Sequence, residues 1–361
     1  MSSAYNPYSE LPKTAFWRTA VATENPYAIE GIFKPKFPIS ENTNIATAGS
    51  CFAQHITRQL KHRNYSVLDV EPAPHDLPEE HHQKYGFSMY SARYGNIYSV
   101  RQLYQLAQEA SGRAVITDHI FKEGDRYYDG LRPSIEPYGL GSAEEVMEHR
   151  SIHLKRVNKL FKSMDLFIFT LGLTEMWCSK KKGTVFPTCP GTVAGEFDPD
   201  EYVFRNPQYS AIIDDFNNFQ KEVSAIRGGR PFNILLTVSP VPLTATASGT
   251  HALLATTYSK SVLRAVAGQL STNQAHIDYF PSFEIATNPR LHSTSYSENL
   301  RNIRPQAVEN VMNHFFASYN TNKIKNHKPN QESPATVYSP IQAKDDTLVQ
   351  CEDQLLEAFG K

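Results

Sequence analysis

The chain has 361 residues, of which 40% are hydrophobic and 20% are charged, and its formal net charge is -1. This length and composition allow one large domain with a substantial core and exclude a largely disordered chain. The balanced charge excludes the strong field that draws a protein to nucleic acid or to an anionic membrane.

The four cysteines form no CxxC pair, and their spacing fits no zinc ribbon or finger. The first residues lack the basic and apolar regions of a signal peptide, and no apolar run approaches the roughly 20 residues that span a bilayer. We therefore expect a cytoplasmic protein with free thiols, no metal site, no membrane span and no nucleic-acid partner.

Residues 1–40 are rich in proline and aromatic side chains, which predicts an arm that lies over the domain surface. Residues 44–48 are a short apolar run that ends in Gly49 and Ser50. Apolar residues then recur at helical spacing from Phe52 to Leu60. This pattern predicts a strand, a tight turn and a helix.

Residues 67–70 suggest a second strand, and the polar stretch 71–92 suggests an insertion loop. Helices are predicted after Ser99 and over residues 143–163, and residues 114–142 between them look irregular. Three further apolar runs end in turn residues, as strands buried on both faces do. These strands are expected at 165–171, 232–238 and 276–280, with helices at 208–226, 256–270 and 305–317.

The alternation of strands and helices predicts a mainly parallel sheet with right-handed crossovers. Residues 41–318 are expected to form this domain. Residues 319–361 are expected to be a linker followed by a tail, and the apolar side chains that recur from Leu348 to Phe359 suggest a short amphipathic helix in the tail. The tail is expected to dock on the domain or to fray.

Ser50 is placed as a nucleophile would be, since function gathers at the carboxyl ends of parallel strands. A serine that opens a helix can also be a simple cap, and the residues alone favour neither role. The surrounding sequence, Gly49-Ser50-Cys51-Phe52-Ala53, resembles the signature of the GSCFA family. Further blocks that resemble this family follow in order at 93–98, 170–177, 237–241, 259–260 and 279–285.

The GSCFA family is related to SGNH/GDSL esterases, lipases and acetyltransferases. The resemblance implies a three-layer α/β/α sandwich with about five strands in flavodoxin-like order and long insertions. It also implies that Ser50 is the nucleophile and that the amides of Ser50 and Gly95 bind an oxyanion. Thr174 stands where the superfamily has an asparagine donor, and Asn96 is another candidate for that role.

The last block of the family usually carries Asp-x-x-His, but this chain has Asn299 and Asn302 at those positions. Asparagine cannot act as a general base near neutral pH, and the triad mechanism requires a base. Either His251 or His292 supplies the base, or the chain has kept the pocket and lost the chemistry. A misplaced alignment of this block is the remaining explanation.

Four other residues are candidates for substrate contacts, and each also has a structural interpretation. Cys51 follows the serine, and a thiol at a helix N-terminus can be reactive, although a buried thiol is the simpler reading. Glu175 and Glu284 follow strands and can bind a hydroxyl or backbone amides. Trp177 can stack on a sugar or anchor the pocket wall.

We therefore expect an acyl-ester hydrolase or O-acyltransferase that acts through Ser50 on a small-molecule or carbohydrate-linked ester, or on an acyl thioester. It requires no cofactor, although acetyl-CoA is a candidate acyl donor. The alternative is a degenerate protein of the same fold that binds a glycan or an acylated ligand without turnover.

Overall fold

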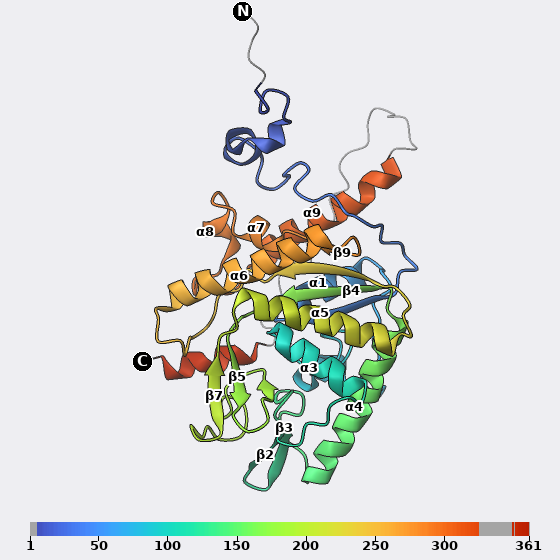
Figure 1. Cartoon of the computed structure of the whole chain (residues 1–361), viewed down its shortest axis with the longest axis vertical. Coiled ribbons are helices and arrows are strands. Elements are labelled where there is room, and N and C mark those ends of the chain that lie inside the picture. The colour runs from blue at the N-terminus through green and yellow to red at the C-terminus, as the bar shows by residue number, and fades with distance from the viewer. Residues whose placement is uncertain (1–5, 325–348, 350, 361) are drawn as a thin grey trace, which may run out of the picture. The chain divides into compact units, whose positions relative to one another are not determined.

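The computed structural model describes residues 6–324, 349 and 351–360 (Figure 1). The chain divides into two compact units. The larger one contains residues 39–279 and the C-terminal segment from residue 345, and the smaller one contains residues 1–38 and 280–344.

The larger unit is built on a parallel sheet, as the sequence predicted. Its strands β1 (Ile45–Gly49), β4 (Leu166–Leu171), β8 (Asn233–Val238) and β9 (Ile277–Tyr279) lie side by side in that order. Nearly every side chain of β1, β4 and β8 is buried, because helices cover both faces of the sheet.

The predicted strand at 67–70 is not a full strand. Only Val67 pairs with β1, through a parallel bridge to Ile45, and the amide of Val70 already donates to the carbonyl of Ser91. Counting this short bridge as a strand gives the flavodoxin-like order, since it lies on the far side of β1 from β4.

The helices complete a three-layer α/β/α sandwich. Helix α1 (Phe52–His62) packs against β1 and β4, and in Figure 1 it lies behind the sheet while α5 (Tyr209–Ile226) passes in front of it. Helix α5 contacts three neighbours, which are α3 (Val100–Ala110), α4 (Ala143–Ser163) and α6 (Ala252–Asn273). The helices predicted in this unit are therefore confirmed.

Two insertions, of which residues 114–142 look irregular in the sequence, contain small antiparallel sheets. One is the hairpin of β2 (Ile120–Glu123) and β3 (Arg126–Asp129), and the other has the order β6 (Val185–Phe186), β5 (Met176–Ser179), β7 (Tyr202–Arg205). Phe121 and Leu131 from the first insertion share a buried cluster with Phe186 and Ala194 from the second. The two insertions therefore support each other. The polar segment 71–92 adds the short helices α2 (Glu79–His82) and η3 (Gln83–Tyr85).

The smaller unit joins the N-terminal segment to the helices that follow β9. These helices are α7 (Ser282–Ala286), α8 (His292–Ser295) and α9 (Pro305–Ile324), and the short turns η1 (Lys13–Ala15) and η2 (Arg18–Ala22) precede them in the chain. The amide of Ile29 donates to Nε2 of His314 over 2.9 Å, and the ring of Phe33 packs against Phe280 and Tyr319. Helix α9 extends beyond its predicted end, and the rest of the predicted linker, 325–340, lies outside the described residues.

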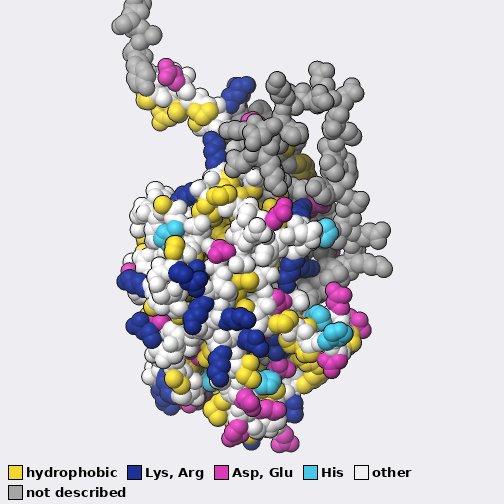
Figure 2. Space-filling view, turned by 90° about the vertical axis from the view of Figure 1, so that its right-hand side faces the viewer, with side chains coloured by type: hydrophobic (Ala, Val, Ile, Leu, Met, Phe, Trp, Pro, Cys, Tyr) yellow, Lys and Arg dark blue, Asp and Glu magenta, His cyan; other side chains and the backbone are white. Residues whose placement is uncertain are grey.

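Side chains of both charges share the face shown in Figure 2, where lysine and arginine gather over the middle and acidic side chains toward the lower end. Within the described ranges, no helix combines the length and the apolar character that a membrane crossing requires. The chain ends in the 3-10 helix η4 (Glu352–Phe359), where the sequence suggested an amphipathic tail.

Gly49 allows β1 and β4 to approach closely at their ends. Its φ is +138°, and an added Cβ would lie 2.5 Å from the carbonyl oxygen of Thr170. We expect Gly49→Ala to lower the free energy of unfolding by at least about 3 kcal/mol, because the clash is with backbone and adds to the left-handed strain. Urea denaturation measures this change.

Gly112→Ala is the matched control, since Gly112 also has a positive φ (+79°) but nothing lies within 4 Å of its added Cβ. It should cost only about 1–2 kcal/mol. Equal losses for the two variants would contradict the close approach of β1 and β4.

Candidate functional site

Ser50 lies in the turn between β1 and α1, at the carboxyl edge of the sheet. Its side chain is 3% exposed, and its hydroxyl has no hydrogen-bond partner among the described residues. No side chain caps α1, so the capping role that the sequence left open is not the one seen. A buried hydroxyl without a partner is costly, and such groups are few in folded proteins.

The loop 95–98 lies against the ends of the paired strands β1 and β4, beside Ser50. The amide of Ile97 donates to the carbonyl of Gly49 over 2.9 Å, and the amide of Gly172 donates to the carbonyl of Tyr98 over 3.2 Å. An added Cβ at Gly172 would lie 2.9 Å from Cβ of Ser50. The two strand ends and the loop therefore enclose the serine side chain.

The candidate oxyanion donors differ in whether they are free. The Ser50 amide donates to the carbonyl of Thr170 over 3.2 Å, so the sheet already uses it. The Gly95 amide makes no hydrogen bond with the described residues. The Thr174 and Thr170 hydroxyls are fully buried and unpartnered, like that of Ser50. Unused donors thus gather at the ends of β1 and β4 and in the adjoining loop.

Asn96 is 1% exposed, and both the oxygen and the nitrogen of its side-chain amide form hydrogen bonds. Its Oδ1 accepts a hydrogen bond from the hydroxyl of Tyr90 and one from Nε2 of Gln54 over 3.3 Å. Its Nδ2 donates to the carboxylate of Glu352, in the C-terminal segment. The side-chain nitrogen of Asn96 is therefore directed at an acidic group from a distant part of the chain.

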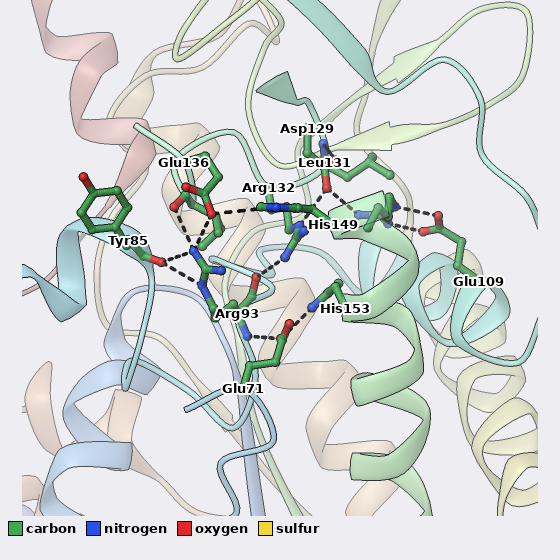
Figure 3. Close-up of polar contacts among 12 residues, drawn as sticks. Glu71, Tyr85, Arg93, Glu109, Asp129, Leu131, Arg132, Glu136, His149 and His153 are labelled. Atoms are coloured by element: carbon green, nitrogen blue, oxygen red, sulfur yellow. Dashed lines mark hydrogen bonds and ion pairs between the residues drawn. The ribbon is translucent and has the colours of Figure 1, made fainter. Parts of the chain in front are cut away.

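A buried network of charges holds the start of this loop, as Figure 3 shows. The Arg93 guanidinium donates to the carbonyl of Tyr85 over 2.7 Å and pairs with Glu136 at 2.8 Å. The Arg93 amide donates to Glu71 over 2.7 Å, and its carbonyl accepts from Arg132 over 3.2 Å. Side chain and backbone of Arg93 are thus both fixed, which leaves the following residues little freedom.

The network continues from Arg132 to the helices. Arg132 pairs with Asp129 at 2.8 Å, Asp129 pairs with Arg150 of α4 at 3.1 Å, and Arg150 also pairs with Glu109 of α3. Although burial favours the neutral acid, Arg150 and Arg132 hold the pKa of Asp129 well below its ordinary value. Glu71 pairs with His153 of α4 at 2.7 Å. The loop beside Ser50 is therefore tied by charges to two helices.

His251 does not contact Ser50 in the structure. It is exposed and occupies the N-cap of α6, where its Nδ1 accepts a hydrogen bond from the Leu253 amide over 3.1 Å. In a neutral imidazole whose Nδ1 accepts, the proton is on Nε2. The ring in this position therefore presents a donor, rather than the acceptor that a general base requires.

Four other candidates belong to the smaller unit. His292 starts α8, with its ring 5.1 Å from that of Tyr296, and Glu284 lies in α7. Asn299 accepts the amides of Arg301 and Asn302 with its Oδ1, at 3.1 and 3.0 Å. Asn299 thus has a turn-forming role.

The remaining candidates in the larger unit have structural partners. Glu175 is half-buried and accepts from the hydroxyl of Thr246 over 2.7 Å, and burial raises its pKa. Trp177 packs edge-on against Phe197 and Phe204, with ring centroids 5.2 and 5.7 Å apart. Cys51 is 5% exposed. These contacts agree with the structural interpretations, and none involves Ser50.

Sequence reasoning missed the acids of the C-terminal segment and the charge network. The only signal for the first is Glu352-Asp353 directly before an apolar stretch, and a pair of acids is ordinary on a surface. Arg132 and Asp129 lie in a stretch that looks irregular. Among the described residues, no group of three or more His, Cys, Asp or Glu side chains is arranged to hold a metal ion.

The model of the GSCFA family matches residues 44–315, which include β1, the charge network and α9 up to residue 315. Comparisons with curated proteins and with solved structures found no match.

The buried pair of Glu71 and His153 makes stability depend on pH. Burial, with a contribution from Arg132, lowers the pKa of His153 from 6.5 to about 4. Between these values the unfolded chain binds a proton that the folded chain does not, so stability falls as the pH falls. The loss from this residue is up to about 1.4 kcal/mol per pH unit.

We expect His153→Asn, which keeps a donor for Glu71 but does not titrate, to flatten the pH dependence of stability below pH 6.5. Urea denaturation of both proteins at several pH values between 7 and 4.5 measures the two slopes. Equal slopes would show that His153 becomes protonated in the folded protein.

Proposed function

Because the chain belongs to the GSCFA family, we propose that it is a serine acyl-ester hydrolase or O-acyltransferase of the SGNH type that acts through Ser50. The observation that carries the proposal is the buried, unpartnered hydroxyl of Ser50 at the carboxyl end of β1. The free amide of Gly95 and the unpartnered hydroxyl of Thr174 support it, since both can donate to a developing oxyanion.

In the proposed reaction, Oγ of Ser50 attacks the carbonyl carbon of an ester or thioester and gives up its proton to a base. The amide of Gly95 and the hydroxyl of Thr174 stabilise the negative oxygen of the tetrahedral intermediate. The bond to the leaving alcohol or thiol then breaks, and the leaving group takes the proton. Water or a carbohydrate hydroxyl next attacks the acyl-serine, which regenerates Ser50.

We assign the base to His251, which lies in the insertion that follows β8. To act, its ring must leave the N-cap of α6 and present an unprotonated nitrogen to Ser50. Motions of loops that complete a site on ligand binding are common in enzymes. Glu175 accepts a hydrogen bond from Thr246 of the same insertion, so a movement of the insertion would also move this partner of Glu175.

A second function is favoured by the position of His251. No imidazole contacts the Ser50 hydroxyl among the described residues, and Asn299 and Asn302 stand where the family has acid and base. A protein with this arrangement can bind an acylated or glycan ligand at the same site without turnover. The enzyme and the binder differ in whether an acyl group ever becomes attached to Ser50.

We expect wild-type protein to hydrolyse p-nitrophenyl acetate or to turn over acetyl-CoA, and Ser50→Ala to reduce the rate by on the order of 10³-fold or more. Cys51→Ala is the control, because it removes the neighbouring thiol and should keep the activity. Mass spectrometry of the wild type, quenched during turnover, should find the acyl group on Ser50. Equal rates for wild type and Ser50→Ala would refute the enzyme, and saturable binding of an acetylated sugar would then support the binder.

The role of His251 is tested by comparing two substitutions. Asn keeps an N-cap acceptor and cannot act as a base, whereas Ala loses both functions. We expect His251→Asn to lower kcat by about 10²-fold or more with little change in Tm. His251→Ala should lower kcat equally and also lower Tm. Full activity of His251→Asn would assign the base to another residue.

A further inference from the structure

The C-terminal segment places a buried carboxylate next to the loop of the candidate site. Glu352 is 4% exposed. Its carboxylate accepts hydrogen bonds from Nδ2 of Asn96, from the hydroxyl of Tyr98 over 2.9 Å and from the hydroxyl of Ser134 over 2.6 Å. All three donors are neutral, and Glu352 has no ion pair among the described residues. Burying an ionised group without a cation is costly.

The three donors belong to the body of the larger unit, so together they form a cradle for a carboxylate. Burial, with the nearby Cys351 and Glu352, raises the pKa of Tyr98 well above its ordinary value, so its hydroxyl remains a donor. Asn96 is oriented by Tyr90, whose hydroxyl also donates to the carbonyl of Ser50 over 3.2 Å. Asn96 is thus held in place independently of the acid it binds.

The cradle adjoins the candidate oxyanion donor. An added Cβ at Gly95 would lie 3.6 Å from Oε1 of Glu352. The same short loop therefore binds the ends of β1 and β4 on one side and the carboxylate on the other.

The way the segment is attached differs from ordinary packing of a terminal helix. Its first two acids, Glu352 and Asp353, are buried, and Asp353 accepts from the hydroxyl of Thr244 over 3.1 Å. Two of its large apolar side chains face outward, since Leu355 is 50% and Phe359 is 70% exposed, while Leu356 is half-buried. Hydrophobic burial therefore accounts for little of the position of the segment, and the polar contacts of its first residues account for more.

We propose that Asn96, Tyr98 and Ser134 form a carboxylate-binding subsite next to Ser50, and that Glu352 occupies this subsite from within the chain. A ligand that carries a free carboxylate beside its acyl ester takes the place of Glu352 and releases the C-terminal segment. This inference rests on the proposed function for the ester, and it adds the chemical class of the substrate and an autoinhibitory contact.

The anchoring role of Glu352 can be tested in the full-length protein with Cys351 as a reporter. Cys351 is 8% exposed, so iodoacetamide should modify it slowly while the segment is bound. We expect Glu352→Gln to raise the alkylation rate of Cys351, mapped by mass spectrometry, on the order of tenfold or more, because hydrogen bonds to a charged group are lost. Ser134→Ala should raise it as well.

Glu357→Gln is the matched control, since Glu357 lies in the same segment but is exposed. In this variant Cys351 should be alkylated at the wild-type rate. Rates for Glu352→Gln within about twofold of this control would overturn the anchoring role.

The ligand class is tested with monoethyl and diethyl succinate, which share an ethyl ester and differ in one free carboxylate. Saturation-transfer NMR with full-length Glu352→Gln should detect the monoester and not the diester, and the wild type should give a weaker signal because Glu352 competes. Ser134→Ala in the Glu352→Gln background should reduce the signal. Equal signals for the two esters, or none for either, would overturn the subsite.

Failure of this proposal can be told apart from failure of the proposed function. Selective binding of the monoester without hydrolysis by any form would refute the esterase and keep the subsite. Hydrolysis that depends on Ser50 and is the same for both esters would keep the esterase and refute the subsite.

Discussion

The close approach of β1 and β4 at their carboxyl ends is the constraint on which the site depends. Gly49 leaves room for the Thr170 carbonyl, and Gly172 leaves room for the side chain of Ser50. A Cβ at either glycine would meet atoms within 3 Å, so larger residues would force the strands or the serine apart. The glycines thus decide where the serine hydroxyl can lie, and the buried sheet holds that position.

A buried network of charges then fixes the loop 95–98, which lies beside Ser50. Arg93 is bound through both its guanidinium and its backbone, and its partners extend to α3 and α4. Such a network is strongly destabilised when one partner is removed, because the other charge remains buried. The loop that carries Gly95 and Asn96 is therefore held more firmly than an ordinary surface loop, as the proposed binding of a developing negative charge requires.

The groups around Ser50 are mostly neutral hydrogen-bond donors, which can bind a negatively charged oxygen. The free amide of Gly95 and the hydroxyl of Thr174 are donors without acceptors, and the neighbouring donors on Asn96, Tyr98 and Ser134 share the carboxylate of Glu352. A group of neutral donors suits an ester that becomes an oxyanion, and it equally suits a carboxylate. The enzyme and the cradle for Glu352 are consistent with one another on this physical ground.

The sequence alone determined the parallel sheet, the principal helices, the family and the place of Ser50 between β1 and α1, because these depend on local periodicity and on contiguous motifs. Only the tertiary structure decided which donors are free, that residues 67–70 pair at one point, and that the insertions form small sheets. It also decided that Glu352 reaches Asn96, 256 residues away in the chain. Contacts of this kind depend on side chains distant in sequence, and a single buried acid leaves no periodic pattern to read.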